Sequence, residues 1–245
     1  MRIHFIRHAE STNNKLLFFN KLLEEHVSDP PLSELGQRQA KALGKFLAEN
    51  REDFNFDRIY ISPFLRTLQT AAAFTDLYPE VPKTVWPDIH EYGGCMRIDP
   101  VKKERFSVPG MTRSEIQAQY PDYTVDEGVT EDGWYFLPGY EPYDVAMERA
   151  HRVRKTMIEQ FGDTDENIAF VSHWDFHILF ANAILELDGS THSRAAISNT
   201  GMSVFEYAQD VWANSPTYWW TLVSINRCEW LTSDLNRDWS TRPQA

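Results

Sequence analysis

Short apolar runs alternate with longer, more polar segments along most of this chain. Six runs are rich in β-branched or aromatic residues and stop at polar ones, as is typical of buried strands. They are residues 2–6, 57–62, 84–86, 168–172, 202–207 and 219–225. The last two are expected to pair with each other, and all six are expected to belong to one sheet.

Between these runs, apolar residues recur at helical spacing. Ser33 is a candidate N-cap for a helix with a stripe of leucine and phenylalanine residues. Ser62 and Pro63 predict another helix start, because serine caps well and proline fits the first turn, which places Arg66 on that turn. Two later helices are predicted, from Pro142 to near Gly162 and over residues 176–187. Strands that alternate with helices favour a mostly parallel sheet covered on both faces.

The chain length and the irregular segments predict the domain organisation. With 245 residues, the chain can bury one sizeable core, so residues 1–230 are expected to form a single domain. Prolines, glycines and aromatics alternate without a period over about residues 95–140, which indicates an insertion folded over the active site rather than a core layer. Residues 231–245 form a polar C-terminal tail that is expected to be peripheral.

Charge and composition narrow the function classes. A total of 24 Lys and Arg residues against 36 Asp and Glu residues gives a formal charge of −12, which disfavours nucleic acid and anionic membrane surfaces as partners. No apolar stretch approaches the length of a membrane span. Cys95 and Cys228 are far apart and are interpreted as free thiols in a reducing compartment. A cytoplasmic enzyme is therefore expected.

Charged and titratable residues follow the ends of several predicted strands. Arg7 and His8 follow the first strand, Arg66 lies just after the second, Glu91 falls on a loop, and His173 ends the strand at 168–172. Ligands of open parallel sheets bind at this carboxyl edge. Arginine grips phosphate with a planar fork, an unprotonated histidine can attack phosphorus, and a carboxylic acid can protonate a leaving alkoxide. Together the residue types predict phosphoryl transfer.

Five motifs in this order resemble those of the histidine phosphatase (phosphoglycerate mutase-like) superfamily. They are Arg7-His8-Ala9-Glu10, Leu32-Ser33-Glu34-Leu35-Gly36, Ser62-Pro63-Phe64-Leu65-Arg66, Val171-Ser172-His173 and Ser198-Asn199-Thr200-Gly201. The resemblance implies a three-layer α/β fold, with a mostly parallel sheet, an antiparallel edge strand and helices on both faces. It spans residues 1 to about 210.

The resemblance also implies roles for individual residues. His8 matches the nucleophile that forms a phosphohistidine, and Glu91 matches the proton donor. The positions that match the phosphate pocket are Arg7, Arg66, His173 and, by a weaker correspondence, Asn14. No metal and no cofactor are implied, and the activity implied is that of a histidine acid phosphatase-type phosphomonoesterase.

Some residues depart from the pattern or have a second interpretation. Ala9 and Trp174 stand where glycine is usual, and we interpret them as tuning specificity, whereas Glu10 is interpreted as structural. His173 and His177 have the spacing of a metal-binding helix, but Trp174 replaces the expected glutamate and no third ligand set is evident. We therefore interpret His177 as a packing residue. The cations of the insertion are interpreted as solvated surface charge; they are Lys102, Lys103, Arg105 and Arg113.

Three functions fit the sequence. The first is hydrolysis of a small soluble phosphate ester, with inorganic phosphate as product. The second is a cofactor-dependent phosphoglycerate mutase-type reaction, which is weakened because Tyr92-Gly93-Gly94 follows Glu91 where mutases usually place an arginine. The third is a catalytically silent phospholigand-binding protein, and the sequence leaves the oligomeric state open.

Overall fold

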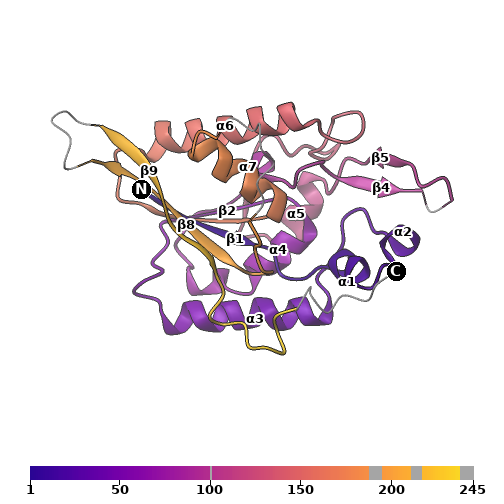
Figure 1. Ribbon diagram of the computed structural model, residues 1–245, viewed down its shortest axis with the longest axis horizontal. Coiled ribbons are helices and arrows are strands. Elements are labelled where there is room, and N and C mark those ends of the chain that lie inside the picture. Colours follow the sequence, from indigo (N-terminus) through magenta and orange to yellow (C-terminus); the bar gives the residue numbers. More distant parts are fainter. Residues whose placement is uncertain (100, 188–194, 211–216, 238–245) are drawn as a thin grey trace.

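A mostly parallel sheet forms the centre of the molecule (Figure 1). The computed structural model describes residues 1–99, 101–187, 195–210 and 217–237. Within them, seven strands lie in the order β6-β3-β2-β7-β1-β8-β9. The strands are β1 (Arg2–Arg7), β2 (Arg58–Ile61), β3 (Lys83–Val85), β6 (Thr124–Val125), β7 (Asn167–Ser172), β8 (Met202–Gln209) and β9 (Tyr218–Arg227). The first five in spatial order are parallel, and β8 and β9 are antiparallel at one edge. The predicted fold class is confirmed.

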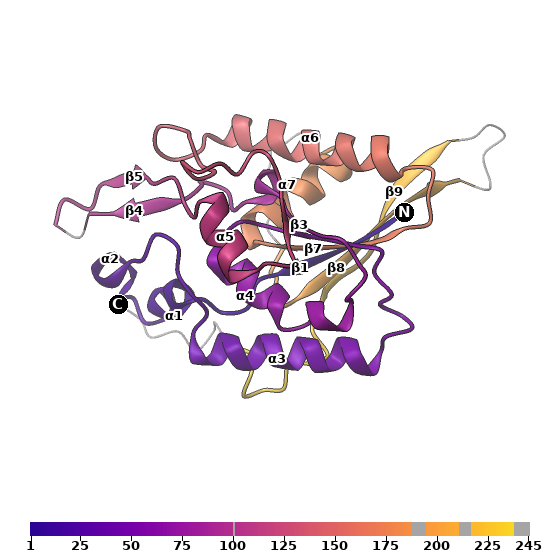
Figure 2. The same cartoon turned by 180° about the vertical axis from the view of Figure 1, so that it is seen from behind.

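Helices cover both faces of the sheet (Figures 1 and 2). Helices α3 (Glu34–Glu49) and α4 (Leu65–Ala72) lie on one face, and α6 (Tyr143–Phe161) and α7 (Trp174–Ile184) lie on the other. Strand β7 shows why: Ala169 and Val171 belong to the core beneath α3 and α4, whereas Ile168 and Phe170 belong to the core beneath α6 and α7. Successive side chains on a strand point to opposite faces, so a fully apolar strand builds both cores.

The smaller elements fill the connections. They are α1 (Thr12–Phe18), α2 (Leu22–Glu25), η1 (Thr75–Leu77), η2 (Pro87–Ile89), β4 (Met96–Ile98), β5 (Arg105–Ser107) and α5 (Arg113–Gln119). Strands β4 and β5 form a separate antiparallel hairpin. In the described part of the chain, no helix combines the length and apolar character needed to cross a membrane.

Helix ends agree with the sequence at most predicted positions. Ser33 caps α3 by accepting a hydrogen bond from the Gly36 amide at 3.0 Å, and α6 ends at Gly162 as predicted. The prediction for Ser62 is wrong, because α4 begins at Leu65 after an uncapped Phe64, although Arg66 does lie on its first turn. The Ser62 hydroxyl instead contacts a histidine of the candidate site. Helix α7 also begins earlier and ends earlier than the predicted 176–187.

The segment 95–140 contributes more to the core than expected. Its strand β6 pairs in parallel with β3 and extends the sheet, and Ile116 of α5 is fully buried. The prediction that this segment lies outside the core layers is therefore wrong, because a strand of two residues gives no periodic signal in the sequence. That the segment covers the active site stays a prediction.

The first part of the C-terminal tail docks onto the body of the protein. The Gln39 side chain donates to the Leu235 carbonyl at 2.8 Å, and Arg237 forms a two-pronged ion pair with the fully buried Glu10. Glu10 also accepts from the Ser33 hydroxyl at 2.7 Å, and the Arg237 guanidinium lies 4.6 Å from the Phe18 ring. Residues 231–237 are all exposed or half-buried, so the peripheral position of the tail stays a prediction, while Arg237 supplies the cation that the buried carboxylate of Glu10 needs.

Candidate active site

The carboxyl ends of β1, β2 and β7 bring the predicted residues together. Arg7 is opposite Ser172 in the β1 and β7 register, so His8 and His173 follow at adjacent ends of neighbouring strands. Ile61 is opposite Val171, and the chain after β2 leads to Arg66. The two histidine rings are 5.2 Å apart between centroids. Three segments distant in sequence therefore meet at one edge of the sheet, as expected.

The His8 ring is held with one nitrogen free to attack. Its Nδ1 lies 2.7 Å from the Ala9 carbonyl oxygen, which can only accept, so Nδ1 carries the hydrogen. Its Nε2 accepts from Arg66 Nε at 3.2 Å. Burial lowers the pKa of His8 well below its ordinary value, and the neighbouring Arg66 and Arg7 lower it further. The unprotonated Nε2 is thus available as a nucleophile at neutral pH.

His173 supports the same guanidinium from the other side. Its Nδ1 accepts from Arg66 Nη2 at 3.1 Å, which leaves Nε2 to donate to the Ser62 hydroxyl at 2.7 Å. Burial lowers the pKa of His173 well below its usual value, with Arg66 as the next cause. The contact explains the position of Ser62, which sequence analysis had interpreted as a helix cap. A neutral His173 thereby fixes the orientation of Arg66.

Arg7 and Arg66 are buried cations without a carboxylate partner. Their exposed fractions are 4% and 7%, and among the described residues neither forms an ion pair within 4.0 Å. Arg7 donates to the Ile197 carbonyl at 2.5 Å and lies 5.0 Å from the Trp174 ring, while Arg66 lies 3.9 Å from the Phe64 ring. Burial lowers the pKa of Arg7 to about 10, so it stays charged at neutral pH. Such a pair favours an anionic ligand.

Glu91 is placed at the same cavity by the turn that follows η2. Its Oε1 accepts from the Tyr92 amide at 3.0 Å and from the Phe176 amide, in the first turn of α7, at 3.2 Å. Burial raises its pKa to about 7, and the nearby Asp175 raises it further against the opposing effect of Arg66. Near neutral pH a large fraction of Glu91 is therefore protonated, as a proton donor requires.

Asn14 also faces this cavity, from the third position of α1. Its side chain forms a capping box with Ser11, in which Oδ1 accepts from the Ser11 amide at 3.2 Å. The Asn199 amide lies 3.4 Å from the same oxygen and donates to the His8 carbonyl at 3.1 Å. The oxygen of Asn14 is thus used within the protein, and its N–H group is the part suited to a phosphate oxygen.

These residues line a cavity of about 350 Å³. Arg7, His8, Asn14, Arg66 and Glu91 lie on its wall, and His173 lies behind Arg66. Sequence reasoning did not single out other lining residues; among them are Asn13, His26, Met96 and Asp175. Asp175 follows Trp174, which departs from the family pattern. This departure was the one feature of the sequence that could have pointed to Asp175 as a cavity-lining residue. The walls therefore come from both the catalytic segments and the loops around them.

The same cluster meets the simplest requirement for a metal site. One ligand atom each from His8, Glu91 and His173 lie within 4.8 Å of one another. However, Arg66 donates to both histidine rings, so their lone pairs face a guanidinium that would repel a metal cation. His177 is not in this group; its ring packs 4.6 Å from that of Phe5, in agreement with a packing role.

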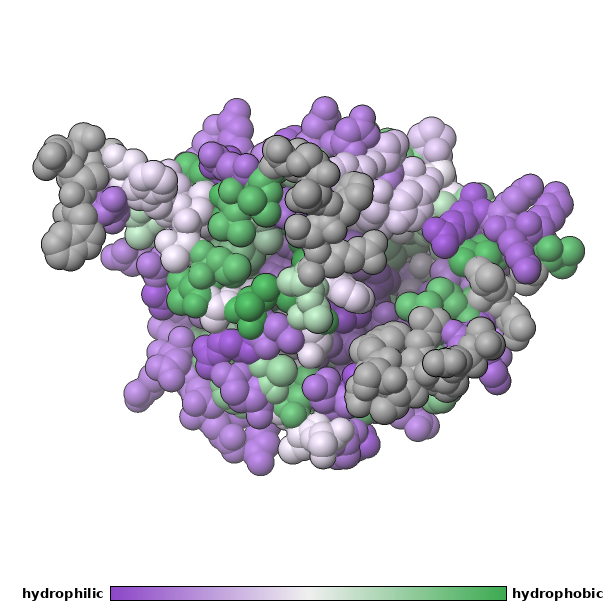
Figure 3. Space-filling model, viewed as in Figure 1, coloured by the Kyte–Doolittle hydropathy of each residue, from purple (hydrophilic) through white to green (hydrophobic). Residues whose placement is uncertain are grey.

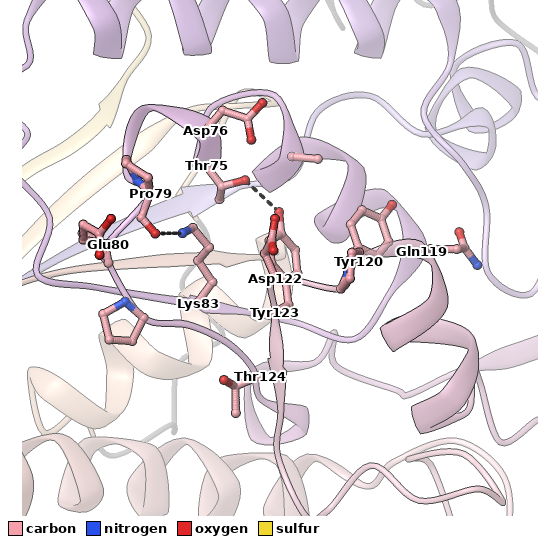
Figure 4. Close-up of a pocket in the computed structure, with 14 residues that line it drawn as sticks. Thr75, Asp76, Pro79, Glu80, Lys83, Gln119, Tyr120, Asp122, Tyr123 and Thr124 are labelled. Carbon is pink, nitrogen blue, oxygen red and sulfur yellow. Dashed lines mark hydrogen bonds between the residues drawn. The ribbon is translucent and has the colours of Figure 1, made fainter.

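A second and larger cavity lies at the opposite edge of the sheet (Figure 4). Its volume is about 860 Å³, and Lys83 and Thr124 mark the amino ends of β3 and β6 in its wall. Lys83 is the one cation in this wall and donates to the Pro79 carbonyl at 3.1 Å, while the Thr75 and Tyr123 hydroxyls are 2.9 Å apart. No histidine, cysteine or serine lines it, so it lacks a nucleophile with a base.

The fold and the site define an α/β protein with two buried guanidinium groups next to an unprotonated histidine. Residues 3–216 match the family model described as histidine phosphatase superfamily (branch 1). The chain belongs to this superfamily, as its motifs had indicated.

Three relatives illustrate the similarity. Fructose-2,6-bisphosphatase TIGAR of Xenopus tropicalis is 39% identical over 71 residues, which are 29% of this chain and 23% of that protein. A Schizosaccharomyces pombe protein named as a probable phosphatase is 27% identical over 150 residues, 60% of this chain and 63% of its own length. The structure of mycobacterial glucosyl-3-phosphoglycerate phosphatase in complex with VO3 shares the fold, with a TM-score of 0.58 and 18% identity. The match covers 92% of this chain and 98% of that one. The matches to the curated relatives thus span less than two thirds of those proteins.

Proposed function

We propose that this protein is a phosphomonoesterase of the histidine acid phosphatase type that hydrolyses a small soluble phosphorylated metabolite. The observation that carries the proposal is that two buried guanidinium groups without a carboxylate partner, those of Arg7 and Arg66, lie at the same cavity as the unprotonated His8 Nε2, which Arg66 contacts. Two fixed cations hold a phosphoryl dianion, and the nucleophile lies between them. The phosphatase names among the relatives agree with this chemistry.

In the first half-reaction, His8 Nε2 attacks phosphorus and a nitrogen–phosphorus bond forms. The bond between phosphorus and the ester oxygen breaks, and protonated Glu91 gives its proton to the leaving alkoxide. The Arg66 N–H groups, which contact the two histidine rings in the free protein, then donate to phosphoryl oxygens. The products are the alcohol, a phosphohistidine and an ionised Glu91.

In the second half-reaction, water attacks the phosphohistidine. Ionised Glu91 accepts a proton from the water as its oxygen bonds to phosphorus, and the nitrogen–phosphorus bond breaks. The lone pair returns to His8 Nε2 and inorganic phosphate leaves, while Nδ1 keeps its hydrogen and still donates it to the Ala9 carbonyl. One group thus acts as acid and then as base, with a pKa of about 7 that suits both steps.

Hydrolysis is favoured over the mutase alternative by the residues after Glu91. Tyr92 follows Glu91 where mutases usually place an arginine, and Gly94, which lines the cavity, has a positive φ of 78° with the Tyr135 ring against it, so it has no room for a side chain. A mutase must hold both ends of its substrate while the phosphohistidine is protected from water. This wall offers no second grip of that kind.

The proposal is tested by trapping the intermediate. Brief mixing with a ³²P-labelled phosphomonoester is expected to label the wild-type protein with an acid-labile, alkali-stable phosphate, as a phosphohistidine gives. His8→Ala should show neither label nor turnover, whereas Tyr123→Phe, in the larger cavity, should show both. Turnover by His8→Ala would contradict the nucleophile, and rapid isomerisation of 3-phosphoglycerate without phosphate release would favour the mutase.

Three further parts of the proposal concern conditions and partners. The formal charge of −12 supports small metabolites rather than nucleic acid as substrates. The guanidinium groups of Arg7 and Arg66 supply the charge that a metal would provide, so activity without a metal is expected. A cytoplasmic location stays a prediction.

A further inference from the structure

Asp175 lies on the wall of the cavity that contains Arg7 and Arg66, and its side chain has the opposite charge type to theirs. It is the second residue of α7, two positions after His173, and it lines the cavity together with Trp174. Its carboxylate is close enough to act electrostatically on both Glu91 and Arg7. Trp174 is fixed by an indole hydrogen bond to the Ala195 carbonyl at 2.8 Å. A carboxyl group thus lines the cavity beside Glu91 and Arg7, in the space open to a bound ester.

Once a phosphoryl group is bound, no cation of the described cavity wall is left to neutralise the Asp175 carboxylate. Arg7 and Arg66 are the two cations of the wall, and both are used by the phosphoryl group. His26 is neutral at pH 7, because burial lowers its pKa and Arg105 and Arg66 lower it further. Arg105 itself is exposed on β5, 5.8 Å from the Tyr140 ring, and is not part of the wall. A second anion in the cavity would therefore meet carboxylates.

We propose that Asp175 selects against phosphate esters whose alcohol part carries a negative charge, so that the preferred substrates are monoesters of neutral or amine-bearing alcohols. This inference rests on the proposed phosphatase function. Two like charges close together in a partly buried site repel strongly enough for a discrimination of about tenfold or more. The chain should then differ in preference from relatives named as bisphosphatases.

A simpler role for Asp175 would be to stabilise the positive end of the α7 dipole, as acids in a first turn commonly do. The protein contains a matched control for that role. Asp144 is the second residue of α6, also in a first turn, but it is exposed and does not line the cavity. If only the helix dipole mattered, Asp175→Asn and Asp144→Asn would have the same effect.

The experiment compares kcat/KM for three small esters that differ in charge, with p-nitrophenyl phosphate as a reference. The esters are phosphoethanolamine, glycerol 3-phosphate and phosphoglycolate. Wild type and Asp144→Asn should both disfavour phosphoglycolate, and Asp175→Asn should raise the ratio of phosphoglycolate to glycerol 3-phosphate at least about tenfold. Asp175→Glu, which keeps the charge, should retain the wild-type preference and shows that the position tolerates substitution.

The outcomes separate this inference from the proposed function. An unchanged ratio in Asp175→Asn, with p-nitrophenyl phosphate still hydrolysed, would overturn the inference alone. A wild-type preference for fructose 2,6-bisphosphate that Arg105→Gln removes would also overturn it, because Arg105 would then be a second phosphate grip. Absence of turnover on every ester, including the reference, would instead contradict the phosphatase proposal.

Discussion

Two cavities of this protein differ in size and in chemistry, and the smaller of the two holds the candidate site. The cavity at the amino ends of β3 and β6 has about 860 Å³, whereas the one around His8 has about 350 Å³. Lys83 in the larger cavity has a backbone partner and three carboxylates around it, Asp76, Glu80 and Asp122. Arg66 in the smaller one is buried and forms no ion pair with any residue that the structure describes. Uncompensated buried charge, rather than volume, distinguishes a site for a charged ligand.

Backbone topology explains why the two edges differ. Strands β1, β2 and β7 are neighbours in parallel register, so the residues that follow them converge. Backbone amides of the α7 amino end point to the same edge, and one of them binds Glu91. At the edge formed by the amino ends of the strands lie the carboxyl ends of helices and connecting loops. In the described chain, helix amide groups do not converge there. The predictions below test this contrast between the cavities.

The largest effect is expected from removing the nucleophile. His8→Ala should lower kcat by at least about 10³-fold, because it removes the proposed nucleophile and with it the covalent intermediate. Vanadate binding, measured by calorimetry, should survive in part through Arg7 and Arg66. Tyr123→Phe removes a hydroxyl from the larger cavity and should leave kcat within about twofold. Comparable losses in the two variants would remove the distinction between the cavities.

A smaller effect that depends on the leaving group is expected at Glu91. Glu91→Gln cannot donate a proton, so hydrolysis of an alkyl phosphate should fall about 10²-fold or more, while an aryl phosphate should lose far less. Glu80→Gln, a carboxylate of the larger cavity, is the matched control and should change neither rate. Equal losses on both classes of ester would show that Glu91 positions the phosphate instead.

The pH dependence of kcat should report the titration of Glu91. Because the pKa of Glu91 is raised to about 7, its acid form is present below that pH and is lost as the pH rises through it. For an alkyl phosphate, kcat should therefore fall about tenfold per pH unit above about 7, and the fall should be weak for an aryl phosphate. His8 stays unprotonated on the acid side of this range, since its pKa is lowered. A profile that is flat to pH 9 with alkyl esters would contradict the assignment.

The docked tail should affect stability. Arg237→Gln leaves the buried carboxylate of Glu10 without its cation, which is expected to lower the free energy of unfolding by about 3 kcal/mol, measured by urea titration. Arg38→Gln removes an exposed ion pair to Asp234 in the same tail and should change stability little. The two variants remove the same charge, so similar small losses would show that Glu10 is satisfied without Arg237.

The smallest effect is expected from chelation. Incubation with excess EDTA followed by desalting should leave the rate unchanged, since Arg66 occupies the positions that a metal would share with His8 and His173. Restoration of a lost activity by zinc or magnesium would show that the three clustered ligands do bind a metal.

The sheet and the charged residues of the candidate site could be predicted because they leave local signals in the sequence. Features that depend on contacts between distant segments could not be predicted in this way. Apolar strands such as β7 leave a clear local signal, and Arg7, His8, Arg66 and His173 follow strand ends in a recognisable order. Strand β6 has two residues and takes its place by pairing with β3, which no local pattern records. The contact between Ser62 and His173 joins residues 111 apart in sequence, so a strong local capping signal was misleading.

The pairing of Glu10 with Arg237 also bears on how the protein matures during synthesis. The carboxylate is two residues from His8, yet its cation is 227 residues further along the chain. On the ribosome, the amino-terminal strand can dock against β7 and β8 only after most of the chain has emerged, and Glu10 is neutralised later still. Until then, the segment that carries the nucleophile contains a carboxylate that resists burial. Assembly of this edge of the sheet is therefore expected to be among the last events of folding, and nascent chains that lack residue 237 should be more sensitive to proteases than the full chain.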